Sequence, residues 1–168
     1  MKKSFELLPF MPPNVTVKRK ASLYTVRYLD EDSSLTAQFF QRPEIHRDHR
    51  AEAEYLAKRL QEYLRVGCVE SDFRKELTPK DSVESLFRGG NFSQPKIRLC
   101  CCRYGRILVI LGNGCLKKSR SSQEDPEYHG MLLEMQAADK LLLERLQKRE
   151  MIMRDNGELA GNLVFNTI

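Results

Sequence analysis

Basic side chains gather in one stretch of this chain, and their types point to phosphate chemistry. Residues 96 to 120 contain no aspartate or glutamate, although the whole chain has 23 of them against 28 lysines and arginines. The cations of the stretch are Lys96, Arg98, Arg103, Arg106, Lys117, Lys118 and Arg120. A compact basic surface is typical of a protein with a phosphate-rich partner. The alternative is a solvated sheet edge that basic residues protect against aggregation.

The cysteines and histidines are not spaced for a metal site or for a nucleophile. The five cysteines are an odd number without a CxxC pair, which favours buried free thiols over disulfides. They are Cys68, Cys100, Cys101, Cys102 and Cys115. His46 and His49 have no third ligand near them in the sequence, so we expect both to be exposed. We expect no metal and no cofactor.

Length and hydropathy favour one soluble domain. The chain has 168 residues, of which 41% are hydrophobic. Its longest apolar run, residues 107–111, is far shorter than the roughly 20 residues that cross a membrane. We therefore predict a cytoplasmic protein that does not enter a membrane. A Pro-rich arm over residues 1–13 should precede a single domain over 14–156, and residues 157–168 should form a tail or an edge strand.

The first half of the chain predicts a strand hairpin followed by a helical hairpin. Residues 23–29 and 35–40 are rich in β-branched and aromatic residues on either side of a polar turn, as in two paired strands. Apolar residues recur with helical spacing over 44–66, and Gly67 supplies the end. Thr78 and Pro79 are typical of a helix start, which predicts a second helix over 79–88.

The second half predicts a strand meander and a long helix. Strands are expected over 96–103, 106–111 and 115–118, with a bend or a bulge at residues 112–114. Asp125 and Pro126 should begin a helix over 126–150. The fold class is therefore α+β: an antiparallel sheet, built largely from the meander, covered by the N-terminal helical hairpin and the long C-terminal helix.

Several short sequence motifs in the meander resemble those of a known family. They are Pro95-Lys96-Ile97-Arg98-Leu99, Gly105-Arg106 with the apolar residues 107–111, Cys115-Leu116-Lys117-Lys118-Ser119, and Pro126. Together with the element order, they resemble the RelE/ParE/HigB-type toxin superfamily of bacterial toxin–antitoxin pairs, particularly its phage-derived, HigB-like branch. In this chain Leu116 or Cys115 replaces the Phe that the family places before the lysines.

The resemblance implies a toxin-like endoribonuclease that cleaves messenger RNA, commonly on the ribosome. The 2′-hydroxyl of a ribose would attack the adjacent phosphate without a metal, which requires a base, an acid and cations for the added charge. The implied catalytic residues are Arg98, Lys117, Lys118 and His129. The implied RNA contacts are Lys96, Arg103, Tyr104, Arg106 and Arg120. The implied protein partner is a small antitoxin of possible helix-turn-helix type.

Ordinary structural roles compete with each of these assignments. Tyr104 is either a base-stacking residue or a turn residue, and His129 is either an acid or base or a solvated helix residue. Arg98 either contacts phosphate or pairs with a helix carboxylate. At the level of the whole protein, the alternative is a non-catalytic nucleic-acid- or protein-binding module that retains the toxin fold. The nuclease hypothesis predicts that Arg98, Lys117, Lys118 and Arg120 converge on one concave face.

Overall fold

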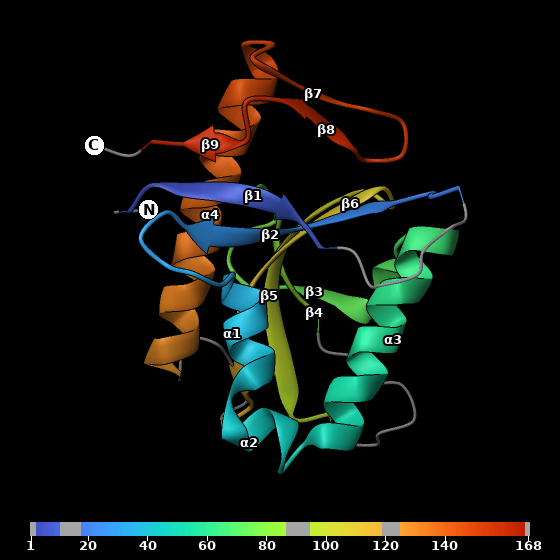
Figure 1. Ribbon diagram of the computed structural model, residues 1–168, viewed down its shortest axis with the longest axis vertical. Helices are drawn as coiled ribbons and strands as arrows, with labels where there is room; N and C mark the ends of the chain where they lie inside the picture. The colour runs from blue at the N-terminus through green and yellow to red at the C-terminus, as the bar shows by residue number, and fades with distance from the viewer. Residues whose placement is uncertain (1–2, 11–17, 87–94, 119–124, 167–168) are drawn as a thin grey trace.

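A seven-stranded sheet organises the protein, as the computed structural model shows for residues 3–10, 18–86, 95–118 and 125–166 (Figure 1). The strand order is β3-β4-β5-β6-β2-β1-β9. Of the pairs in this sheet, β2 with β6 is parallel and the others are antiparallel. The strands are β1 (Phe5–Pro9), β2 (Ser22–Tyr28), β3 (Phe73–Lys75), β4 (Val83–Leu86), β5 (Ile97–Tyr104), β6 (Leu108–Leu116) and β9 (Val164–Phe165).

Helices cover both faces of this sheet, and each face has its own apolar core. On one face lie α1 (Leu35–Gln41), α2 (Pro43–His46) and α3 (Arg50–Val66), which pack around a cluster that includes Phe39, Ile45 and Leu60. On the other face lie α4 (Pro126–Gln147) and a hairpin of β7 (Met151–Met153) and β8 (Leu159–Gly161). The fold is therefore α+β with a mostly antiparallel sheet, and the described residues contain four α-helices, of which the C-terminal one is long.

A bulge in β6 sets which side chains face each core. Leu99 pairs with Gly114 and Cys101 pairs with Leu111, so two residues of β6 stand opposite Cys100. The extra residue shifts the alternation of β6 by one position, as bulges do. The sequence predicted either a bend or a bulge at residues 112–114, and the bulge is confirmed. The predicted strands 106–111 and 115–118 are a single strand, which ends before Lys117.

Two predictions for the N-terminal part are wrong, whereas the predicted strand over residues 23–29 is confirmed as β2. Residues 5–9 of the predicted arm form β1, because Phe5 and Leu7 alternate inward and are buried opposite Tyr28 and Val26 of β2. Residues 35–40 form the helix α1 instead of a strand. Ser34 caps that helix by accepting a hydrogen bond from the Ala37 amide, and the strand neighbours of β2 are β1 and β6.

The predicted helical hairpin is also wrong, although α3 covers the sheet as expected. The expected helix 44–66 is interrupted at residues 47–49, where His49 has φ −128° and ψ 36°, and Gly67 ends α3 with φ 92°. The predicted helix 79–88 contains the strand β4, whose four residues are buried against β5. Thr78 caps a turn through the amides of Lys80 and Asp81. Residues 87 and 88 lie outside the described part of the chain.

The C-terminal predictions agree better with the structure. The long helix begins at Pro126 with Asp125 as its cap, as predicted, and ends at Gln147. Arg149, with φ 61°, turns the chain into β7. The edge-strand alternative is confirmed for Val164 and Phe165, which pair with β1 as β9. Arg145 holds this strand from α4, since its guanidinium donates to the Val164 carbonyl at 2.6 Å and lies 3.8 Å from the Phe165 ring centre.

No helix in the described ranges is both long enough and apolar enough to cross a membrane.

The packing on β6 yields a stability prediction. A Cβ at Gly114 would lie 2.5 Å from the Arg98 carbonyl oxygen and 3.0 Å from the Phe39 ring. We expect Gly114→Ala to lower the free energy of unfolding by about 1–3 kcal/mol, measured by urea denaturation, because the backbone must shift to admit the methyl group. Gly130→Ala, on the open side of α4, is the control and should instead raise stability by up to about 1 kcal/mol. Equal effects of the two variants would contradict this account.

Candidate functional site

Exposed lysines meet at one end of the β5–β6 pair. The Lys117 amide donates a 2.6 Å hydrogen bond to the Lys96 carbonyl, so the two residues stand side by side where the strands end. Lys96, Lys117 and Lys118 are all exposed. We call Lys96, Lys117 and Lys118 the strand-end cluster. The structure thus brings together lysines that are 21 residues apart in the sequence.

The first turn of α4 closes one side of this cluster. The Lys118 ammonium lies 3.8 Å from the Glu127 carboxylate, which ties the end of β6 to the start of the helix. His129 lies two residues further along and is half-buried. Its Nδ1 is buried and has no hydrogen-bond partner among the described residues. The first turn of α4 therefore carries an imidazole that is only partly solvated, but residues two apart on a helix face different directions, so the Lys118–Glu127 contact does not place His129 beside the lysines.

Arg98 lies beneath the cluster and away from solvent. It pairs with Cys115 across the strands and is only 5% exposed. Its guanidinium carbon lies 5.8 Å from the centre of the Tyr128 ring, on the α4 face of the sheet. In this arrangement the Arg98 guanidinium lies between the sheet and α4, whereas the hypothesis of one concave face requires Arg98 to reach the surface.

A buried carboxylate anchors the start of β5. Glu52, in the first turn of α3, is 5% exposed, and its Oε1 accepts hydrogen bonds from the Lys96 and Ile97 amides at 2.8 and 2.9 Å. The N-terminal end of a helix favours a negative charge at this position. Glu52 was not among the predicted site residues. Glu52 has helical spacing to Leu56 and Tyr63, so it lies on the apolar face of the helix, and a carboxylate on that face was the signal in the sequence that indicated a buried role.

The other predicted RNA contacts lie at the far end of the β5–β6 hairpin. Arg103 donates two 2.8 Å hydrogen bonds to the Glu84 carboxylate, and Tyr104 donates a 2.6 Å hydrogen bond to Asp139. Burial raises the pKa of Tyr104 well above its usual range, so the phenol keeps its proton. Arg106 is exposed and donates to the Cys68 carbonyl.

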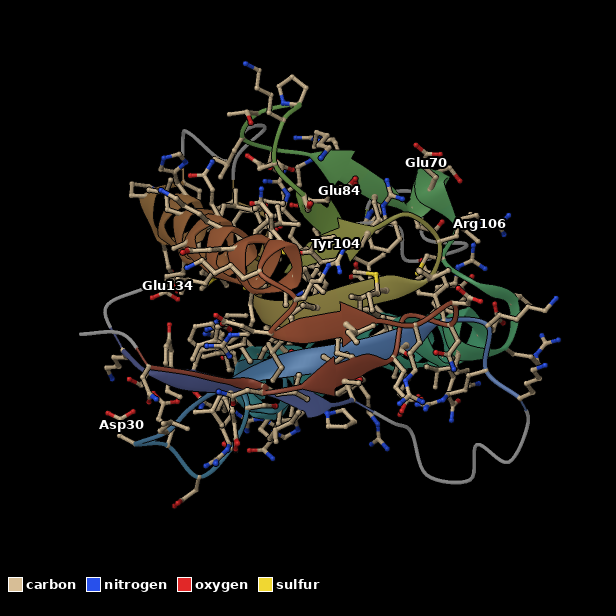
Figure 2. All side chains as sticks on the ribbon, turned by 90° about the horizontal axis from the view of Figure 1, so that it is seen from above. Asp30, Glu70, Glu84, Tyr104, Arg106 and Glu134 are labelled. Carbon is tan, nitrogen blue, oxygen red and sulfur yellow. The ribbon has the colours of Figure 1, made fainter. Side chains whose placement is uncertain are left out.

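Figure 2 shows the side chains of Glu84, Tyr104 and Arg106 on the β3–β5 side of the molecule. Six residues of β5, or roughly 20 Å, separate Tyr104 from Arg98, whereas Glu84 pairs with Cys101 and is nearer to Arg98. Arg120 lies outside the described residues.

The five cysteines are buried free thiols, as predicted. Burial raises the pKa of the Cys115 thiol to about 12 and that of Cys68 to about 12. In Cys100, Cys101 and Cys102 burial likewise raises the thiol pKa well above its usual range. A neutral, buried thiol is a poor nucleophile and a poor metal ligand. Within the residues that the structure describes, no group of three or more His, Cys, Asp or Glu side chains is placed to hold a metal ion.

Comparison of the chain with protein-family models, with curated proteins and with solved structures gives no match.

Glu52 leads to a prediction about the scaffold of the cluster. Glu52→Ala leaves the Lys96 and Ile97 amides without their buried acceptor, so we expect the free energy of unfolding to fall by about 1–3 kcal/mol. Glu52→Gln keeps one acceptor oxygen and should lose less. Urea denaturation measures both, with Glu54→Ala on the exposed side of α3 as the control. If Glu52→Gln lowered the free energy of unfolding as much as Glu52→Ala, the negative charge and not the hydrogen-bond acceptor would be the stabilising feature.

The thiols give a second prediction. At pH 8 the folded protein should react with Ellman's reagent at least a hundredfold more slowly than a free thiol, because a raised pKa leaves little thiolate at that pH. Unfolding in urea should release five reactive thiols within the dead time of mixing. Fast labelling of even one thiol in the folded protein would show an activated cysteine, and mass spectrometry would identify it.

Proposed function

We propose that this chain is the toxin-like component of a toxin–antitoxin pair and acts as a metal-independent endoribonuclease. The strand-end cluster carries the proposal, because it places three exposed lysines beside the first turn of a long helix. The order of elements supports it as well. Helices α1 to α3 precede an antiparallel meander, β4-β5-β6, that runs into Lys117 and Lys118, and α4 follows.

The cluster and the first turn of α4 together offer the side chains that such a cleavage requires. Attack of a 2′-hydroxyl on the adjacent phosphate adds negative charge to the phosphorus centre, and ammonium groups held in place stabilise that charge. Lys117 and Lys118 are assigned to the scissile phosphate, Lys96 to a neighbouring phosphate, and His129 to proton transfer. Arg98, which pairs with Cys115 near the end of β6, is assigned to position the strand end that carries the lysines. The 2′-hydroxyl requirement selects RNA over DNA.

A second candidate is a non-catalytic module that binds nucleic acid or protein. The burial of Arg98 and the carboxylate pairs of Arg103 and Tyr104 favour it, because they leave fewer of the assigned residues facing a substrate. A module that binds nucleic acid would share with the nuclease an RNA phosphate backbone on Lys96, Lys117 and Lys118, and would differ in leaving the RNA uncut. A module that binds protein would not bind RNA there.

The nuclease proposal predicts growth arrest with cut transcripts when the gene is induced alone. Lys117→Gln combined with Lys118→Gln should reduce cleavage by about 10²–10³-fold, the usual effect of losing a transition-state cation, as measured by mapping transcript 5′ ends. Lys140→Gln removes an exposed lysine from the middle of α4 and is the matched control. Co-expression of a small helix-turn-helix protein encoded next to the gene should restore growth.

Two results would speak against the nuclease. Intact transcripts and normal growth on induction would favour the binding module. Cleavage that the double lysine variant leaves unchanged would remove the strand-end cluster from the reaction. The role of Arg98 is tested with Arg98→Ala, which should slow cleavage while leaving RNA affinity within about twofold.

A further inference from the structure

A groove of about 540 Å³ lies on the helical face opposite α4, between α1, α2 and α3. Its lining residues are Phe40, His46, Arg50, Ala53, Glu54 and Ala57. Its volume is within the range of sites for small ligands, roughly 300–1,000 Å³. We propose that this groove binds the base of an RNA nucleotide next to the cleaved phosphate. The inference rests on the proposed function, since it extends the path of the same RNA.

The walls of the groove suit a flat aromatic ligand that carries a negative group. Phe40 is half-buried and offers a ring for stacking, while the small side chains of Ala53 and Ala57 leave room along α3. His46 and Arg50 are exposed at the rim and can contact phosphate. Arg50 also pairs with Glu54 at 2.8 Å, which holds its guanidinium along the helix. Aromatic rings combined with cations are how proteins bind unpaired bases and their backbone.

The groove is joined to the strand-end cluster through Arg42. This residue follows α1, and its guanidinium donates to the Gly114 carbonyl at 3.2 Å and to Asn113 Oδ1 at 3.1 Å, close to the end of β6. Lys117 follows three residues after Gly114. Phe40 is likewise only two residues before Arg42, so the chain places the groove and the lysines at the same end of the sheet.

Charge favours RNA over a protein segment as the occupant. The corner between α1 and α3, residues 42–50, contains three arginines and two histidines against Glu44 and Asp48. Arg50 is paired with Glu54 of the groove, and Lys96 adjoins this corner because its amide donates to Glu52 in the first turn of α3. A single strand that crosses this end would meet Lys96 and Lys117 on the sheet and His46 and Arg50 at the groove, and its base would enter the apolar part.

The test uses a fluorescein-labelled RNA hexamer with 2′-O-methyl groups, which lacks the attacking hydroxyl and stays intact. Fluorescence anisotropy measures its affinity for the full chain. Ala57→Leu fills the groove and should weaken binding about tenfold, the scale of one lost stacked base. Ala51→Leu makes the same change at an exposed alanine of α3 outside the groove and should bind as the unaltered protein does. Phe40→Leu keeps an apolar wall without the ring and should also weaken binding.

The outcomes separate the groove from the proposed function. If Ala57→Leu and Ala51→Leu bind the hexamer equally, or if the unaltered protein does not bind it, the groove proposal is overturned. The transcript mapping with the lysine variants decides the nuclease independently. If the Ala57→Leu protein no longer binds the partner protein that restores growth but keeps its affinity for the RNA hexamer, the groove is a protein-docking site and the proposal is likewise overturned. Melting temperatures of the variants show whether each one is folded.

Discussion

Helices pack against both faces of β6 so closely that there is no room for a side chain at two positions of this strand. Gly112 lies under Met135 of α4, and a Cβ there would come within 2.7 Å of the Met135 sulfur. Gly114 lies against Phe39 of α1. Thr36 of α1 adds a hydrogen bond to the Gly112 carbonyl. Because both layers of helix are positioned by this one strand, its bulge fixes the register of the whole site: Cys115 stands opposite Arg98, and Lys117 next to Lys96.

The charged side chains are arranged differently along the β3–β5 edge of the sheet and at the end where β5 begins and β6 ends. At the β3–β5 side they are paired and partly buried: Arg103 binds Glu84, and Arg59 donates to Asp72 at 2.6 Å. These contacts hold the short strands together, since losing one partner of a buried ion pair is costly. At the other end, Lys96 and Lys117 have no ion pair within the described ranges, and Lys118 has only a 3.8 Å contact with Glu127. Positive potential is therefore left where β5 begins and β6 ends.

Local patterns predicted the elements that depend on local contacts. The apolar spacing and the Asp125 cap were sufficient for α4, and the residues of β5 were sufficient for a strand. They failed at residues 35–40, where β-branched and aromatic residues fit either structure, and at residues 83–86, where the Thr78-Pro79 helix-start signal was misleading and tertiary partners decide. Thr36 turns inward to bond Thr25 and the Gly112 carbonyl, and β4 is held by β5. In the site, the exposed lysines were predictable from charge alone. The burial of Arg98 and the anchoring by Glu52 depend on contacts between segments distant in the sequence.

The pairing of β1 with β9 has a consequence for how the chain acquires its structure. Phe5 stacks on Phe165 with ring centres 4.8 Å apart, so two segments separated by 160 residues complete the same edge. Contacts of such long range form late, because the closure entropy of the intervening loop must be overcome first. During synthesis β1 is made before β9, so the outer edge of β1 stays unpaired and accessible to other chains until β9 has been made. Arg145, on a helix already folded against the sheet, then offers a fixed guanidinium to which the final strand can attach.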